Sequence, residues 1–197
     1  MKTKITPAIF VILLVTHLFP KLTNGQSISK EEIIHGAILA APEALREGAM
    51  VYGYNSEGKV YVLREGANQM VCLADDPAAD GFSAACYHKD LEPFMARGRE
   101  LKAEGKKFKE IFDIRESEVK AGKLKMPEKA MLHILTGDSY DPATKTVINE
   151  YRRWTFYIPY ATSETSGLPD KPAGPGIPWL MDAGTHRAHI MIMPEKN

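Results

Sequence analysis

The stretch that indicates the fold is residues 49–73, which read AMVYGYNSEGKVYVLREGANQMVCL. It contains two runs rich in β-branched and aromatic residues, at 49–54 and 59–64, and a third, mainly apolar run at 69–73. Two short segments separate these runs, and each contains a glycine, which is typical of tight turns. Three consecutive short strands joined by short turns predict a β-meander over the whole stretch.

Strand-like runs return in the second half of the chain, near 130–135, 153–158 and 187–193. Helical signals lie in other segments, and the first is Ser29 followed three residues later by Glu32, the pattern of a capping box. Helices that are segregated from runs of strands favour an α+β fold. We therefore expect a largely antiparallel sheet with helices packed on it.

A second helical region follows Asp90, and residues 97–125 hold ten Lys and Arg against six Asp and Glu. These basic residues are not interleaved with aromatic ones, so we interpret the segment as the solvated faces of two surface helices. The alternative is a patch for an anionic partner. The whole chain of 197 residues has a formal net charge of zero, and we expect no nucleic-acid partner.

The N-terminus has the features of a secretory signal peptide. A basic start at 1–4 precedes an apolar run at 8–15, and the small residues Thr23 and Gly25 precede the expected cleavage point. The run is too short for a membrane-spanning helix, which needs about 20 residues. We therefore predict a signal peptide over 1–25, no stable membrane insertion after its cleavage, and an exported protein that is periplasmic or secreted.

The exported part, residues 26–197, has no internal repeat and is expected to form a single domain. Its two cysteines, Cys72 and Cys86, should form a disulfide in an oxidising compartment. The segment between them, 75–81, has the composition of a loop. The alternative, a catalytic or redox thiol, lacks the CxxC spacing of such sites.

The segment that contains His186 and His189 is the strongest candidate in the sequence for a metal-binding or catalytic site. With Asp182, the two imidazoles could bind zinc, and a metal-dependent hydrolase is the alternative function. Residues three apart on a strand point to opposite faces, so both rings could reach one ion only if His186 lies in a loop before the strand. The other interpretation is a loop histidine and a strand histidine with ordinary hydrogen bonds. No cofactor is predicted apart from this zinc.

Residues 159–187 contain a long segment rich in proline and glycine, which is unusual in a compact domain. Tyr160 and Trp179 could form an aromatic surface there beside His186 and Arg187. The alternative is that Trp179 anchors the loop on the sheet. The leading hypothesis is an exported, non-enzymatic domain that binds a small molecule or a protein partner through this loop.

Two parts of the sequence also support a resemblance. They are residues 63–68, LREGAN, followed by 70–73, MVCL, and residues 184–186, GTH, with 189–192, HIMI. In these strings the chain resembles a group of small secreted bacterial proteins to which no activity is assigned. The resemblance implies a bacterial exported domain, and it implies no catalytic residue.

Overall fold

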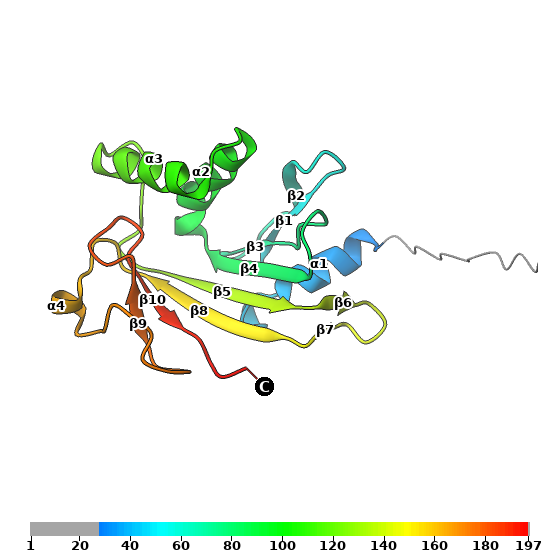
Figure 1. Ribbon diagram of the computed structural model, residues 1–197. Coiled ribbons are helices and arrows are strands. Elements are labelled where there is room, and N and C mark those ends of the chain that lie inside the picture. Colours follow the sequence, from blue (N-terminus) through cyan, green and yellow to red (C-terminus); the bar gives the residue numbers. More distant parts are fainter. Residues whose placement is uncertain (1–27, 197) are drawn as a thin grey trace, which may run out of the picture.

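The structure is a computed structural model that describes residues 28–196, so the expected signal peptide at 1–25 lies outside the described residues. Its centre is an eight-stranded, mostly antiparallel sheet with the order β2-β1-β3-β4-β5-β8-β10-β9 (Figure 1). The strands of this sheet are β1 (Met50–Tyr54), β2 (Val60–Arg64), β3 (Met70–Leu73), β4 (Phe82–His88), β5 (Ala130–Gly137), β8 (Tyr151–Tyr157), β9 (Trp179–Met181) and β10 (His189–Ile192). A separate two-stranded ribbon consists of β6 (Ser139–Asp141) and β7 (Thr146–Ile148).

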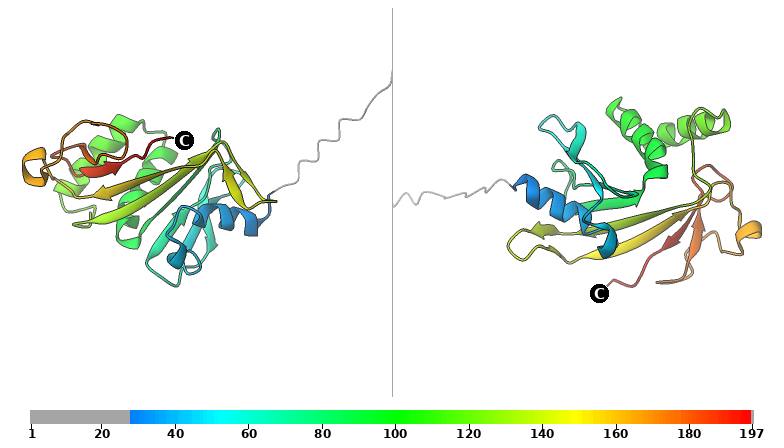
Figure 2. Two further views of the ribbon diagram at one scale, coloured as in Figure 1. Left: turned by 90° about the horizontal axis from the view of Figure 1, so that it is seen from below. Right: turned by 180° about the vertical axis from the view of Figure 1, so that it is seen from behind.

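Helices cover both faces of one half of this sheet, as Figures 1 and 2 show. The α-helices are α1 (Lys30–Ile38), α2 (Glu92–Ala103), α3 (Phe108–Lys120) and α4 (Ser163–Ser166), and short 3-10 turns span Glu43–Leu45 and Lys89–Leu91. Because side chains alternate along a strand, Cys72 of β3 packs in the core under α1 and its neighbour Val71 packs in the core under α2. The α+β prediction is confirmed. No helix among residues 28–196 is long and apolar enough to cross a membrane.

The N-terminal half of the sheet departs from the meander in one pairing. The β1–β2 hairpin forms as predicted, but β3 pairs with β1, in parallel, rather than with β2. The turn after β2 crosses the start of β1, where the amides of Ala67 and Asn68 donate to the carbonyl of Gly48 at 2.7 and 3.0 Å. The direction of β3 is therefore the one that a meander requires, and only its neighbour differs.

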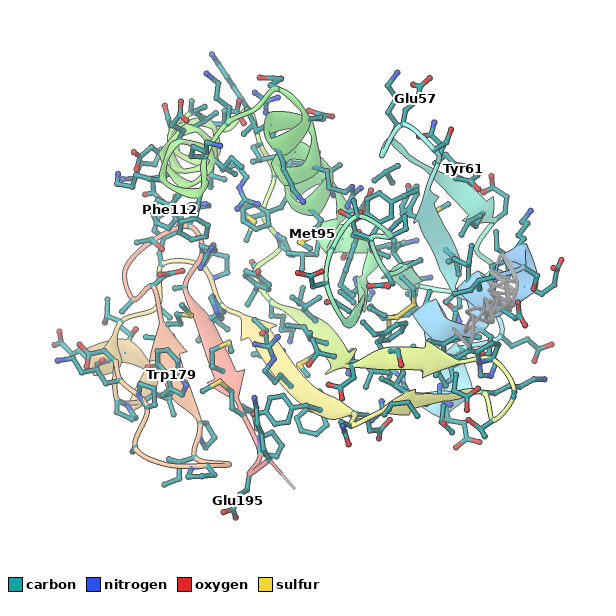
Figure 3. All side chains as sticks on the ribbon, turned by 45° about the vertical axis from the view of Figure 1, so that its right-hand side comes forward. Glu57, Tyr61, Met95, Phe112, Trp179 and Glu195 are labelled. Carbon is teal, nitrogen blue, oxygen red and sulfur yellow. A yellow bond between two sulfur atoms is a disulfide. The ribbon has the colours of Figure 1, made fainter. Side chains whose placement is uncertain are left out.

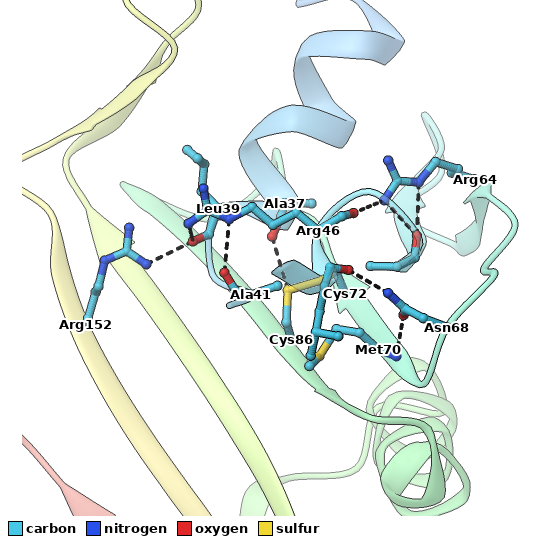
Figure 4. The surroundings of a disulfide bond; sticks show 12 residues. Ala37, Leu39, Ala41, Arg46, Arg64, Asn68, Met70, Cys72, Cys86 and Arg152 are labelled. Atoms are coloured by element: carbon cyan, nitrogen blue, oxygen red, sulfur yellow. Dashed lines mark hydrogen bonds between the residues drawn. A yellow bond between two sulfur atoms is a disulfide. The ribbon is translucent and has the colours of Figure 1, made fainter. Parts of the chain in front are cut away.

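The disulfide between Cys72 and Cys86 is confirmed, and it joins β3 to a strand, β4, that the sequence analysis missed. The two residues face each other across the antiparallel pair, with Cα atoms 4.0 Å apart, and both are fully buried under α1 (Figure 4). The loop between these strands contains residues 75–81, as expected from their composition. The disulfide thus links the two strands that flank this loop.

Both ends of α1 are satisfied by hydrogen bonds. At its start the capping box predicted for Ser29 and Glu32 is present, with both reciprocal bonds. At its end the carbonyl of Leu39 accepts from Arg152 at 2.9 Å and from Arg46 at 3.3 Å, as Figure 4 shows. These contacts fix the helix on the sheet.

The basic segment 97–125 forms two helices, α2 and α3, as predicted. The two helices are joined by an ion pair between Arg97 and Glu118 at 2.8 Å. One basic residue departs from the prediction, because Arg115 turns inward, is only 8% exposed, and stacks on the ring of Phe94 at 3.9 Å.

Candidate functional site

The loop before β10 lies beneath α3 and brings His186 against Glu116. The ring Nδ1 of His186 donates to Glu116 Oε2, and the backbone amide of His186 donates to the same oxygen at 2.8 Å. The imidazole is fully buried, with its edge to Phe94 and Phe112 at centroid distances of 5.5 and 4.9 Å. Figure 3 shows Phe112 on the side of α3 that faces this loop. The pair therefore fastens α3 to the C-terminal part of the chain.

The protonation states follow from this burial. Burial lowers the pKa of His186, although Glu116 opposes the shift, and the imidazole is neutral at pH 7. Burial also raises the pKa of Glu116, but hydrogen bonds from Lys120 and His186 outweigh it and lower the pKa to about 2. The Nε2 atom of His186 has no hydrogen-bond partner among residues 28–196. Because this atom is buried, a substrate at the protein surface cannot reach it.

The three candidate zinc ligands are directed to different partners. Asp182 accepts from Arg187 at 2.6 Å, and His189 Nδ1 lies 2.6 Å from the Arg187 carbonyl oxygen. His186 does lie in the loop before the strand, but its Nδ1 is committed to Glu116. In the part of the chain that the structure describes, no group of three or more His, Cys, Asp or Glu residues is placed to hold a metal ion.

The two candidate aromatic residues, Trp179 and Tyr160, lie on different elements, and Tyr160 is the more exposed of the two. Trp179 is on β9, at the opposite end of the sheet from the β1–β2 hairpin that carries Tyr61 (Figure 3). Tyr160 is in the turn after β8, is 41% exposed, and has a left-handed φ of 63°. Neither Trp179, Tyr160, His186 nor Arg187 lines either of the two cavities described below.

One cavity lies between α1, the loop at 75–81 and the start of β6, and we call it the α1 cavity. Its volume is about 440 Å³. Most of its lining side chains are aliphatic or aromatic, and the lining residues are Ile28, Glu32, Ile33, Gly36, Tyr54, Asp75, Pro77, Gly81, Phe82, Ser139 and Tyr140. Sequence reasoning missed this site because its residues come from segments more than 100 positions apart and carry no motif.

One wall of the α1 cavity contains two aromatic rings beside a glycine. Phe82 and Tyr140 are stacked with centroids 6.1 Å apart. A Cβ atom at Gly36 would lie 3.4 Å from the Phe82 ring and 3.6 Å from the Tyr140 ring, so a larger side chain at this position would enter the cavity. The Tyr140 hydroxyl is 2.9 Å from Nδ1 of His35, and burial lowers the pKa of that histidine.

The polar groups of the α1 cavity are few. Asp75 accepts a hydrogen bond from the backbone of Ser83 at 2.8 Å, and burial raises its pKa. Burial, with the nearby charge of Asp76, raises the pKa of Tyr54, so its phenol stays protonated at pH 7. The arrangement can hold an apolar body and offer it a small number of hydrogen-bonding groups.

A second, larger cavity of about 630 Å³ lies between the β1–β2 hairpin and α2, and we call it the α2 cavity. Ion pairs lie along its rim, including Lys59 with Glu57 at 2.8 Å and Lys102 with Asp76 at 3.9 Å. Its lining residues are Tyr52, Tyr54, Glu57, Gly58, Lys59, Val60, Asp76, Ala78, Ala96, Arg99, Glu100, Lys102 and Ala103. Six charged side chains line this cavity, whereas two line the α1 cavity.

Comparisons with protein-family models, with curated proteins and with solved structures found no match for this chain. Functional inference therefore depends on the geometry of the chain itself.

Proposed function

We propose that this protein binds a small, mainly apolar molecule in the α1 cavity. The observation that carries the proposal is a concave site of about 440 Å³ with a stacked aromatic pair, Phe82 and Tyr140, in its wall. Small-molecule sites are typically clefts of roughly 300 to 1,000 Å³ lined by apolar and aromatic side chains with a few polar groups. The volume and the chemistry of the α1 cavity both fit this description.

The elements around the α1 cavity are held in place before any ligand arrives. The Cys72–Cys86 disulfide joins the two strands that flank the loop forming one wall, and the caps of α1 hold the opposite wall. A site with few conformations to lose on binding retains more of its contact free energy as affinity. The framework therefore supports a binding function.

The proposal keeps the binding hypothesis but moves it to a different part of the molecule. The loop at 159–187 was the expected site, but two of its candidate residues, Asp182 and Arg187, pair with each other, and no residue of this loop lines the α1 cavity. The charged rim of the α2 cavity suits an apolar ligand less well. For the alternative, a metal-dependent hydrolase, residues 28–196 provide no group of three or more His, Cys, Asp or Glu residues that could hold a metal ion.

We further infer that the domain works outside the cytosol, in the periplasm or the medium of a bacterium. The predicted signal peptide at 1–25 supports this, and so does a disulfide in the core of the domain, because disulfides persist in oxidising compartments.

The direct test is the binding of a neutral fluorescent probe, N-phenyl-1-naphthylamine, to the purified domain. We expect saturable binding that Gly36→Leu weakens tenfold or more, since the added side chain enters the α1 cavity. The matched control is Ala96→Leu, which places the same side chain from a helix into the α2 cavity and should leave the affinity within about twofold. Thermal unfolding of both variants checks that they fold.

Two results would refute the proposal. One is a wild-type domain that binds no probe. The other is equal weakening by Gly36→Leu and Ala96→Leu, which would place the probe outside the α1 cavity.

A further inference from the structure

The charged groups that line the α1 cavity are all carboxylates. They are Glu32, on the first turn of α1, and Asp75, in the loop after β3. Among the described residues that line the cavity, none is a lysine, an arginine or a histidine. The apolar interior is therefore bordered by negative charge alone.

Asp75 is the less satisfied of the two carboxylates. It is half-buried and accepts a backbone hydrogen bond from Ser83 at 2.8 Å. Within residues 28–196 no basic side chain lies at ion-pair distance from it, whereas its neighbour Asp76 has Lys102 at 3.9 Å. A partly buried carboxylate without a cation is costly, and a positive group in the cavity would relieve that cost.

Glu32 is fixed in position and in charge. Its Oε2 accepts from the backbone amide of Ser29 at 2.6 Å, and this bond lowers the pKa of the carboxyl. A charged Glu32 at the mouth of the cavity adds to the field of Asp75 and disfavours an anionic ligand.

The aromatic rings favour the same kind of ligand as the carboxylates do. The cavity is lined by Tyr54, Phe82 and Tyr140, and the face of an aromatic ring attracts a cation within about 6 Å. Aromatic rings combined with carboxylates are a common means of binding an ammonium group.

We infer that the ligand of the α1 cavity is an organic cation, an ammonium group on a hydrophobic body, with the ammonium beside Asp75 and the body against Phe82 and Tyr140. The inference rests on the proposed function, since it names the chemical class of the molecule that the same cavity binds. It also predicts that affinity falls with ionic strength, because salt screens the carboxylates.

The test compares three competitors that share a six-carbon chain and differ in charge. Hexyltrimethylammonium, 1-hexanol and hexanoate are each used to displace N-phenyl-1-naphthylamine from the wild-type domain. We expect the cation to bind at least tenfold more tightly than the alcohol, and hexanoate to bind most weakly.

Two variants in the loop after β3 test which carboxylate attracts the cation. Asp75→Asn keeps the oxygen that accepts from Ser83, and it should weaken the cation about tenfold while the probe and the alcohol bind as before. Asp76→Asn removes the same charge from the adjacent residue, which lines the α2 cavity, and should change the affinity of the cation less than twofold. Thermal unfolding again checks the fold of each variant.

The possible outcomes separate this inference from the proposed function. If the cation and the alcohol compete equally, the ligand class is wrong and the apolar site stands. If Asp75→Asn and Asp76→Asn weaken the cation equally, its binding is general surface attraction and the inference is wrong. If no probe binds to the wild-type domain, both the inference and the proposed function are wrong.

Discussion

The hydrogen bonds to Glu116 fasten α3 to the loop before β10, and their removal should loosen that junction. The carboxylate receives the backbone amide and the ring Nδ1–H of His186 on one oxygen and Lys120 on the other, at 2.7 Å. The side chain of Glu116 is 17% exposed and that of His186 is fully buried. The variant Glu116→Gln keeps the shape and removes the charge.

The loss of stability expected for Glu116→Gln can be worked out from these contacts. Hydrogen bonds to a charged group contribute about 1.5 to 3 kcal/mol each. The amide oxygen of Gln can still accept from His186, but more weakly, and Lys120 loses its ion pair. We expect Glu116→Gln to lower the free energy of unfolding by about 2 to 3 kcal/mol, since one or two charged bonds are weakened and none is fully replaced.

The pH dependence gives an independent check. The pKa of Glu116 is lowered to about 2 from 4.5, so its contribution to stability is complete above about pH 5 and is lost as the pH falls through 4.5 toward 2. Burial lowers the pKa of His186 from 6.5, so the contribution of the neutral ring is present above that pH and declines below it. Wild type should therefore lose stability on acidification, and Glu116→Gln should lose less between pH 5 and pH 2.

The assay is urea unfolding at several pH values, followed by circular dichroism. The control is Lys120→Gln, which removes a partner that is 65% exposed and should cost less than about 1 kcal/mol. The reasoning is refuted if Glu116→Gln is as stable as wild type at pH 7, or if both proteins lose the same stability between pH 5 and pH 2.

Three further predictions concern the disulfide, the β6–β7 ribbon and export. Replacing Cys72 and Cys86 together with alanine should lower the free energy of unfolding in urea by about 3 kcal/mol, since the disulfide no longer closes a loop of about 15 residues in the unfolded chain. Unchanged stability would contradict this. Gly137→Ala should lower the free energy of unfolding by about 1 to 3 kcal/mol, and with it the melting temperature, because the added Cβ would lie 2.5 Å from the carbonyl oxygen of Ile148. An unchanged melting temperature would argue against that contact. The intact mass of the protein exported by a bacterial host should correspond to a chain that starts at Gln26, and a retained Met1 would show that the signal prediction is wrong.

Local signals in the sequence were sufficient for the elements that depend on near neighbours. The β1–β2 hairpin follows from alternation around one glycine-containing turn, and the start of α1 follows from Ser29 and Glu32 three positions apart. The neighbour of β3 was not predicted, because it depends on how the turn after β2 packs. That turn hydrogen-bonds to Gly48 at the start of β1, and β3 lies beside β1.

The sequence alone determined the strands β1, β2, β3, β5, β8 and β10, the capped start of α1 and the pairing of the two cysteines, because each of these depends on residues within about fifteen positions. It did not predict β4. The tertiary structure decided which side chains contact one another. His186 was a candidate ligand in the sequence, and its partner Glu116 lies 70 positions earlier, on a helix whose docking no periodicity describes. The α1 cavity likewise joins Gly36, Asp75 and Tyr140, which meet only because the sheet brings distant segments together. Burial and charge at a site are properties of such long-range neighbours, and they exist only once the chain has packed.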